Sequence, residues 1–308
     1  MTSNYYKEIL EHYNNPKVQS EIAEFCKNRW VGVQCETLDT HGKKVLVRYL
    51  GRRRIPLQIH HPMDVKNLVL RFISLKPRTI YATANLYKRL TKEEDVVNLS
   101  NIEACMPTWD VDNNLENWDA TVQTVKEIIS TLESYGVTKS VFVKFSGRGA
   151  HVHIHPYAIS ENLRRKHNPL DLAYAIVEYV REKIHRKVLD IAVRFKAEKL
   201  RVDNEIDPQR LFVSPLSIHR ENLKVSVCIN PRKIEEFNPE EDAKLAKFNH
   251  YEGWKSYEEG EANELAEKAY EFVGGYPTLP KPRRRKHPPV DKQIIKWLSL
   301  TGFEDRKK

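Results

Sequence analysis

KFSGRGAHVHIHP (residues 144–156) follows the apolar run VFV and contains three histidines spaced two residues apart. His151, His153 and His155 alternate with apolar residues. Because the side chains of a strand alternate between its two faces, this period predicts a strand with the three imidazoles on one face. Imidazole is a preferred ligand of zinc, so the pattern alone leaves a histidine metal site open.

The front half of the same stretch indicates a different use. The segment SGRG, residues 146–149, is a glycine-containing turn directly after a strand. In such turns, backbone N–H groups and an arginine side chain can hold phosphate oxygens. We therefore expect Ser146, Arg148 and the neighbouring His151 to contact a phosphate group, and the other two histidines to be scaffold residues of the strand.

Two aspartates lie upstream in PTWDVDNN, residues 107–114. Asp110 and Asp112 are two residues apart, so on an extended strand both carboxylates project from the same face. Two adjacent carboxylates repel each other unless a cation lies between them, and hard oxygen ligands suit Mg²⁺ or Mn²⁺. The alternative for an isolated pair of this kind is a strand end with solvated carboxylates.

A third polar cluster lies downstream in RVDNEIDPQRLFVSPLSIHRENLKVSV, residues 201–227. It combines carboxylates, a cation and a histidine that ends a short turn between two strands: Asp203, Glu205, Asp207, Arg210 and His219. Each residue alone is a weak signal. The order of a carboxylate, a basic residue and a histidine matches that of the first two clusters, which favours one common site.

The segments around these clusters predict a mixed α/β fold. Apolar residues at three- and four-residue spacing predict two short helices within 4–30, broken near Pro16, and longer helices over 119–135 and about 169–185. Alternating residues around the Gly-Arg-Arg-Arg turn predict a hairpin over 44–60. Further strands are expected around 103–112, 137–145, 210–214 and 223–229, separated by crossover helices.

Composition sets the broad class of protein. The 308 residues suffice for one large domain or two ordinary ones, and the formal charge of +9 mildly favours a polyanionic partner such as nucleic acid. Four scattered cysteines favour a reducing compartment. The first residues lack the apolar core of a signal peptide, and no apolar run approaches a membrane span. We expect a soluble, cytoplasmic protein with no membrane partner.

The C-terminal part differs in composition. After about residue 232 the chain becomes charged and helical up to residue 276. Residues 277–289 contain five of the 16 prolines and five lysines or arginines, which predicts an extended linker over 277–290. The last segment, 291–308, is a short amphipathic tail with Trp297, a plausible docking element. The predicted division is therefore a domain over 1–276, a linker and a tail.

Taken in order, the three clusters resemble a known family. The motifs are D-x-D, then S-G-R-G-x-H, then an acidic residue ahead of R-L-x-x-S-P-x-S-x-H. They resemble those of the small catalytic subunit of archaeal and eukaryotic DNA primases, in the archaeo-eukaryotic primase superfamily. The resemblance spans about residues 4–245. It implies a primase-type catalytic core of mixed β-sheets flanked by helices, with a helical C-terminal extension.

The resemblance also implies an activity. The family carries out two-metal nucleotidyl transfer and copies single-stranded DNA into short RNA or DNA primers, as a DNA-directed polymerase of DNA replication. Asp110 and Asp112 would bind both Mg²⁺ or Mn²⁺ ions, with Asp203 as the third carboxylate and Asp207 as its competitor. The partners implied are a single-stranded DNA template, NTPs or dNTPs and a primase large subunit, in a nucleoid-associated setting.

The same resemblance assigns the nucleotide contacts. Ser146, Arg148 and His151 match the triphosphate-binding motif of the family, and Arg210 and His219 match its second phosphate-contacting group. The stretch between Asp203 and His219 is about two residues shorter than usual, which leaves the third carboxylate open.

Two further departures from the family concern a side chain and a metal. Val213 stands where relatives often carry lysine or arginine. Many relatives hold a zinc knuckle, whereas the candidate ligands in this chain are too loosely spaced, so we expect no structural zinc. These candidates are Cys26, Cys35, His41, His60 and His61.

Two alternatives stay open. A histidine-rich metallohydrolase would be built around the imidazoles of 151–155. A non-catalytic relative would use the same fold to bind nucleic acid, and Val213 is its best support. Intact carboxylate and S-G-R-G-x-H motifs argue against the second alternative, since a binding module has no obvious need for carboxylates that face a phosphate site.

Overall fold

A computed structural model describes residues 2–277, with side chains from Tyr6 onward. The predicted linker beyond Pro277 and the predicted tail 291–308 lie outside the described residues. The helices are α1 (Thr2–Tyr13), α2 (Pro16–Cys26), α3 (Pro62–Arg71), α4 (Glu94–Val97), α5 (Trp118–Glu133), α6 (Glu161–Lys166), α7 (Pro169–Arg194), α8 (Pro239–Asp242) and α9 (Asn263–Val273). No helix among these residues is long and apolar enough to cross a membrane.

The strands form two five-stranded sheets and one small hairpin. The strands are β1 (Arg29–Leu38), β2 (Lys44–Val47), β3 (Tyr49–Leu50), β4 (Ile55–Pro56), β5 (Pro77–Tyr87), β6 (Ile102–Cys105), β7 (Thr108–Asp112), β8 (Val141–Phe145), β9 (Ala150–Ile154), β10 (Arg201–Asn204), β11 (Leu211–Val213) and β12 (Cys228–Ile229). The first sheet has the order β11-β5-β1-β2, with β6 also on β5, and the second has the order β10-β7-β9-β8-β12.

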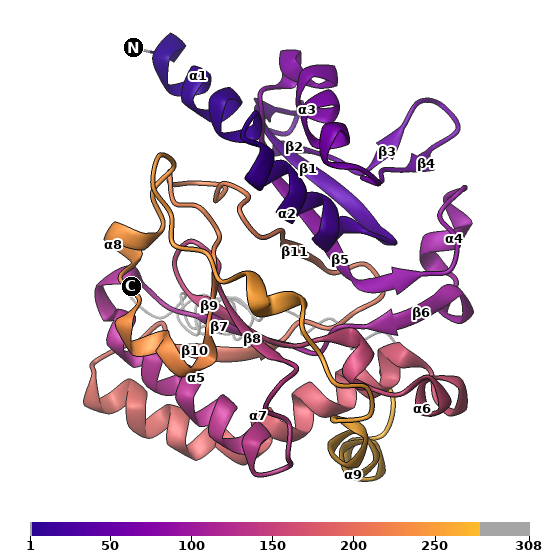
Figure 1. The fold of residues 1–308 in the computed structure, drawn as a ribbon, viewed down its shortest axis with the longest axis vertical. Helices are drawn as coiled ribbons and strands as arrows, with labels where there is room; N and C mark the ends of the chain where they lie inside the picture. Colours follow the sequence, from indigo (N-terminus) through magenta and orange to yellow (C-terminus); the bar gives the residue numbers. More distant parts are fainter. Residues whose placement is uncertain (1, 278–308) are drawn as a thin grey trace, which may run out of the picture. The chain divides into compact units, whose positions relative to one another are not determined.

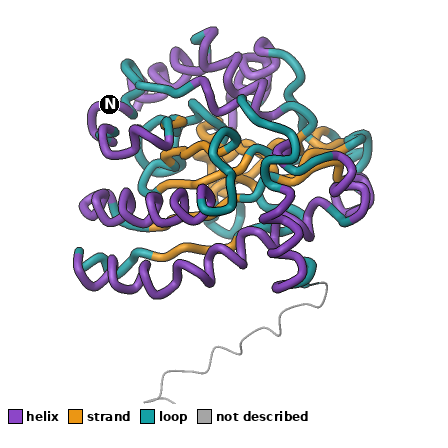
Figure 2. The backbone as a smooth tube through the Cα atoms, turned by 60° about the horizontal axis from the view of Figure 1, so that its bottom comes forward, coloured by secondary structure: helices purple, strands orange, loops and turns teal. Residues whose placement is uncertain are grey.

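Helices flank both sheets, which confirms the mixed α/β class. Helices α2 and α3 contact each other, and α2 packs on β1 and β5, whereas α5 and α7 pack on β7 and on other strands of the second sheet. Figure 1 shows the first group beside the N-terminal sheet and the second group beneath the sheet of β7–β10. The turned view shows helices on both sides of the central strands (Figure 2).

The strand pairing differs from a simple crossover pattern. Every pairing between the named strands of the described residues is antiparallel. Helix α5 does carry the chain from β7 to β8, but β9 then inserts between them. Strand β9 can do this because the tight turn at 146–149 reverses the chain directly after β8.

Several predicted elements are confirmed, with different bounds. The two N-terminal helices, the helix after residue 118 and the hairpin exist, although only β3 and β4 pair across the arginine turn, while β2 pairs with β1. Asn168 caps α7 with its side chain and Pro169 occupies the first turn, as predicted, but α7 continues to Arg194. Strand β1 was not predicted.

The stretch 102–112 is not one strand. It divides at Met106 and Pro107 into β6, which pairs with β5, and β7, which belongs to the second sheet. The Met106 amide still donates to the Ala84 carbonyl, while Pro107 accepts from the Ile154 amide. The chain thus crosses from one sheet to the other immediately before the two aspartates.

Candidate active site

Strand β7 directs its aspartates away from the helices. Trp109 and Val111 are fully buried, and the Trp109 indole donates to the Val177 carbonyl of α7 at 3.0 Å. Because successive side chains alternate, Asp110 and Asp112 point to the opposite face of the sheet. The two-residue spacing therefore does place both carboxylates together, as the sequence predicted.

Cross-strand pairing builds a polar row on this face. Asp203 of β10 stands opposite Asp110, and Asp110 stands opposite His151 of β9. His151 in turn stands opposite Lys144 of β8. Lys144 was not predicted as part of the site. Its side chain is fully buried without a hydrogen-bond acceptor among the described residues, and burial lowers the pKa of Lys144 to about 7.

Two arginines neutralise the carboxylates. The Arg201 guanidinium lies 2.5 Å from Asp112 Oδ2 and 2.7 Å from Asp203 Oδ2. The Arg210 guanidinium lies 2.5 Å from Glu205 and 3.4 Å from Asp110. Arg201 was missed in the sequence, although its position two residues before Asp203 on the same strand was a usable signal. Each arginine thus bridges two carboxylates.

His151 pairs with the carboxylate of Asp110. Its Nε2 lies 3.4 Å from Asp110 Oδ1, while its Nδ1 has no hydrogen-bond partner among the described residues. Burial alone would raise the pKa of Asp110, but the neighbouring His151 and Arg210 outweigh it and lower that pKa. Asp110 is therefore a carboxylate at neutral pH.

The turn at 146–149 depends on its glycines. Gly147 has φ +115°, which L side chains rarely adopt, and a Cβ there would lie 2.4 Å from the His219 ring. A Cβ on Gly149 would lie 2.1 Å from the Val111 carbonyl oxygen. Glycine is therefore required for the turn to approach both His219 and the aspartate strand.

His219 presents one ring nitrogen as a donor. Its Nδ1 accepts weakly from the amides of Glu221 and Asn222, both at 3.3 Å, so the proton of a neutral ring lies on Nε2. Burial, and then the charge of Arg148, lower the pKa of His219 to about 4. At neutral pH the ring is therefore an uncharged hydrogen-bond donor.

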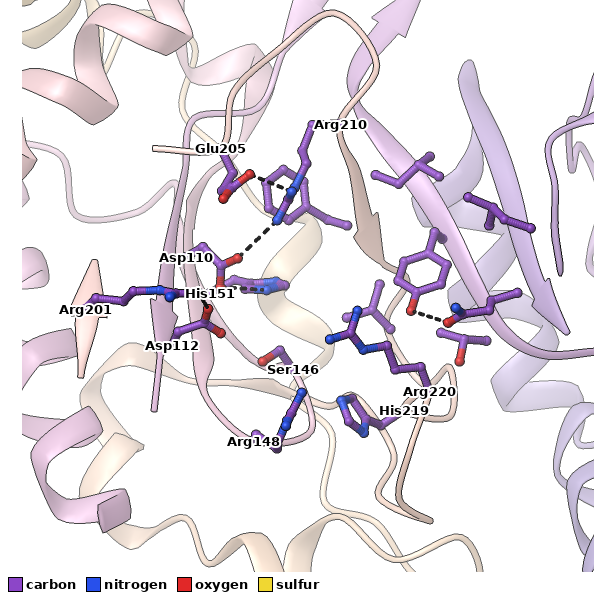
Figure 3. A pocket seen from close by; sticks show the side chains of 17 residues that line it. Asp110, Asp112, Ser146, Arg148, His151, Arg201, Glu205, Arg210, His219 and Arg220 are labelled. Atoms are coloured by element: carbon purple, nitrogen blue, oxygen red, sulfur yellow. Dashed lines mark hydrogen bonds and ion pairs between the residues drawn. The ribbon is translucent and has the colours of Figure 1, made fainter. Parts of the chain in front are cut away.

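Most of these groups line one cavity of about 480 Å³, but Asp203 and Lys144 are not among its lining residues. Figure 3 shows Asp110, Asp112 and Arg201 on one side, and Ser146, Arg148 and His219 on another, with Arg220 beside His219. Arg148 also pairs with Glu221 at 3.2 Å. Arg220 was missed in the sequence although it directly follows His219.

The first sheet supplies the remaining wall of the cavity. The Tyr81 hydroxyl donates to Gln34 Oε1 at 3.2 Å, and Val213 stands opposite Tyr81 in the strand register. No local sequence signal marks Gln34 or Tyr81, because β1 and β5 reach the polar clusters of the cavity only through tertiary packing. Val213 contributes an apolar surface to the cavity.

The two candidates for the third carboxylate, Asp203 and Asp207, and the nearby Glu205 lie in different places. Asp203 is in register with Asp110, and its carboxylate is held by Arg201. Glu205 lines the cavity, and burial raises its pKa. Asp207, like Asp203, is not among the lining residues of the cavity, and its carboxylate accepts from the Gln209 amide at 2.6 Å. The register thus favours Asp203 over Asp207.

The donor set fits a hard divalent cation chemically. Carboxylate oxygens are the ligands that Mg²⁺ and Mn²⁺ prefer, and Asp110 and Asp112 present them from one face beside Asp203. Within residues 2–277 no three His, Cys, Asp or Glu side chains are gathered closely enough to hold an ion. The Arg201 side chain lies between the carboxylates, so it must move for them to converge.

The other two histidines, His153 of β9 and His155 just after it, do not line the cavity that holds the phosphate-type donors. His153 is fully buried, stacks on Phe142 at 4.7 Å between ring centroids and pairs with Thr108 Oγ1 at 2.8 Å. His155 follows the strand and stacks on Tyr257. The three imidazoles therefore do not converge on one point.

No protein-family model matches the chain, and no curated protein matches it in sequence. Among solved structures, the chain is similar to the polymerase domain of ligase D from Mycobacterium tuberculosis in complex with DNA. The TM-score is 0.54 and the sequence identity is 12%. The match covers 88% of this chain and 90% of that chain. The chain has the fold of that polymerase domain. The AEP domain of the cyanophage S-2L primase-polymerase matches with a TM-score of 0.32 and 14% identity over 75% of this chain and 96% of that domain.

The cavity is built within one compact unit of the chain. Its lining residues run from Gln34 to Arg220, and that unit extends to Tyr276. The aspartate strand, the glycine turn and the His219 turn are therefore parts of one folded body and not separate motifs.

Proposed function

We propose that this chain is a nucleotidyltransferase of the archaeo-eukaryotic primase superfamily that copies a single-stranded DNA template. One observation carries the proposal: a single cavity has carboxylates on one side and hydrogen-bond donors suited to phosphate on another. Such an arrangement suits a substrate that carries a polyanion beside a reacting centre in need of cations. The polymerase-domain fold supports the same function.

Different residues of the cavity bind the nucleotide and the metal ions in this proposal. Ser146, Arg148, His219 and Arg220 bind and orient the triphosphate through hydroxyl, guanidinium and neutral imidazole donors. Mg²⁺ or Mn²⁺, when held by Asp110, Asp112 and Asp203, supplies Lewis-acid activation of the attacking hydroxyl and neutralises charge at the α-phosphate. His151 holds the Asp110 side chain in place.

Within that superfamily, we assign the chain to the small catalytic subunit of a DNA primase. The order of the three motifs supports it, and the partners proposed with it are NTPs or dNTPs and a primase large subunit. Unlike a histidine-based hydrolase, this assignment leaves His153 and His155 outside the chemistry, consistent with their burial and stacking.

The decisive experiment offers the purified protein an unprimed single-stranded template with Mn²⁺ or Mg²⁺ and labelled NTPs or dNTPs in separate reactions. We expect short, template-dependent products, which gel electrophoresis sizes. The same templates with an annealed primer separate de novo synthesis from extension. Nucleotide binding without incorporation on any template would overturn the proposal in favour of a non-catalytic relative.

Substituting Gly147 tests the turn. Gly147→Ala combines a positive φ with a contact of 2.4 Å to the His219 ring, so it displaces the imidazole. We expect the KM for nucleotide to rise about tenfold, the effect of one lost hydrogen bond to a charged group. Gly136→Ala is the matched control, because Gly136 has φ +77° with no atom within 4 Å. An unchanged KM in Gly147→Ala would exclude the turn from nucleotide binding.

A further inference from the structure

A second cavity of about 250 Å³ lies at the other end of the strands that bear the catalytic cavity. On β9, His151 lines the catalytic cavity, whereas His155, just past the strand end, lines the second one. On β1, Gln34 lines the catalytic cavity and Arg29 the second. At about 3.3 Å per residue, the two cavities are about 13–17 Å apart along these strands.

Aromatic side chains form one wall of this second cavity, here called the aromatic pocket. It is lined by His155, Tyr157, Trp254, Tyr257, Arg29 and Lys27. The rings of His155 and Tyr257 stack at 4.3 Å with an interplanar angle of 3°. Tyr257 is 48% exposed although it is a large aromatic residue. The stack therefore presents an open aromatic platform to solvent.

A buried cation lies behind the platform. Arg29 is 5% exposed, and its guanidinium donates to the carbonyls of Thr83 and Ala84 and to the Met106 sulfur. Within the described residues no carboxylate pairs with it. Burial and the Arg29 charge together lower the pKa of His155 to about 3, so the stacked imidazole is neutral. The pocket thus has an uncompensated positive charge beside neutral rings.

Charged side chains at the rim of the aromatic pocket add to the positive charge of Arg29. Lys27 is exposed at the pocket. Lys255 is also positive, but Glu21 neutralises it at 2.5 Å. Glu24 is the acidic residue of the pocket lining. The net charge of the pocket is therefore positive, which favours a ligand that is both flat and anionic.

We propose that the aromatic pocket binds one nucleotide unit of a single nucleic-acid strand, with its base stacked on Tyr257 and its phosphate near Lys27 and Arg29. Stacking platforms combined with cations are the usual means of binding single strands without sequence preference. The volume of about 250 Å³ is below that of most small-molecule sites, which suits one unit of a longer ligand. The inference concerns binding alone and does not depend on turnover.

Fluorescence anisotropy with a labelled single-stranded oligodeoxyadenylate tests this site. A chelator is present and nucleoside triphosphates are omitted, so the result is independent of the proposed catalysis. We expect Tyr257→Ala to weaken binding about tenfold, since one base stack contributes about 1–3 kcal/mol. Tyr257→Phe retains the ring and should bind within about twofold of the wild type.

Two further measurements separate the contribution of base stacking from the contribution of charge. An abasic strand of equal length keeps the phosphates, so Tyr257→Ala should bind it as the wild type does, whereas Lys27→Ala should weaken both strands and reduce the salt dependence. Phe272→Ala, which removes an aromatic ring that is 67% exposed on α9, is the matched control and should leave binding unchanged.

Three results would contradict the proposed nucleotide site. Unchanged affinity of Tyr257→Ala for the oligodeoxyadenylate, with thermal unfolding at the wild-type temperature, overturns the site. Equal loss of affinity for the abasic strand overturns the stacking assignment. If free AMP competes as tightly as the strand does, the ligand is a mononucleotide and the strand assignment is wrong.

Discussion

Replacing Asp110 and Asp112 together by asparagine is expected to abolish template-dependent incorporation, by at least about a thousandfold, or about 4 kcal/mol of transition-state stabilisation. The two carboxylates share one sheet face and line the cavity that also holds the phosphate-type donors. Asparagine keeps their size and hydrogen-bond acceptors but removes both negative charges. Without those charges the site cannot concentrate divalent cations beside the reacting phosphate.

The double substitution should leave the fold intact. Arg210 keeps Glu205 as its partner, and Arg201 keeps Asp203. Circular dichroism and thermal unfolding check this point before activity is compared. Incorporation at the wild-type rate by a folded double variant would contradict the proposed chemistry.

Asp207→Asn is the matched control. Asp203 is in register with Asp110, whereas Asp207 lies beyond the end of β10. The Asp207 carboxylate accepts from the Gln209 amide, a bond that asparagine can also make. Its incorporation rate should stay within about twofold of the wild type, whereas Asp203→Asn should lower the rate by about a hundredfold or more. The reverse result would transfer the third-carboxylate role to Asp207.

The aspartate pair and the glycine turn of this site could be predicted from the sequence, because the geometry of each depends on neighbouring residues only. A two-residue period places Asp110 and Asp112 on one face in any strand, and a glycine turn after a strand indicates exposed N–H groups. What the sequence could not supply is the wall from the first sheet. Gln34 and Tyr81 reach the cavity through pairings across more than 40 residues, and no periodicity within either strand reports them.

The division of 102–112 was unpredictable for a related reason. The apolar and acidic residues form one continuous pattern, and only the presence of two sheets decides that Met106 and Pro107 form a corner. The sheet order also follows from long-range contacts, since β9 separates β7 from β8 despite the helix between them in sequence. Local patterns identify some of the strands, but not β1, β5 or β10, and they do not identify which strands pair.

A buried carboxylate joins the two ends of the described chain. Glu21 of α2 has a side chain that is 4% exposed and accepts from three groups of the segment 250–255. These groups are His250 Nε2 at 3.0 Å, the Trp254 indole at 2.7 Å and Lys255 Nζ at 2.5 Å. The N-terminal helices are thereby fastened to the C-terminal segment that also builds the aromatic pocket.

Substituting Glu21 by alanine is expected to lower the free energy of unfolding by about 3 kcal/mol at pH 7. The variant leaves the buried Trp254 indole without its acceptor and the partly exposed Lys255 without its counter-charge. Glu24→Ala on the same helix is the control, because Glu24 is exposed, and it should change stability by less than about 0.5 kcal/mol. Urea unfolding followed by tryptophan fluorescence measures both variants.

The pH dependence of stability tests whether the charge of the Glu21 carboxylate causes this loss of unfolding free energy. Burial alone would raise the pKa of Glu21, but the bonds from His250, Lys255 and Trp254 outweigh it and lower that pKa from 4.5 to about 2. Since the folded pKa is below the unfolded one, the stabilisation is complete above about pH 4.5 and declines as the pH falls toward 2. Glu21→Gln should therefore differ from the wild type more at pH 7 than at pH 3.5. A difference that stays constant across this range would mean that packing, and not the carboxylate charge, joins the two ends.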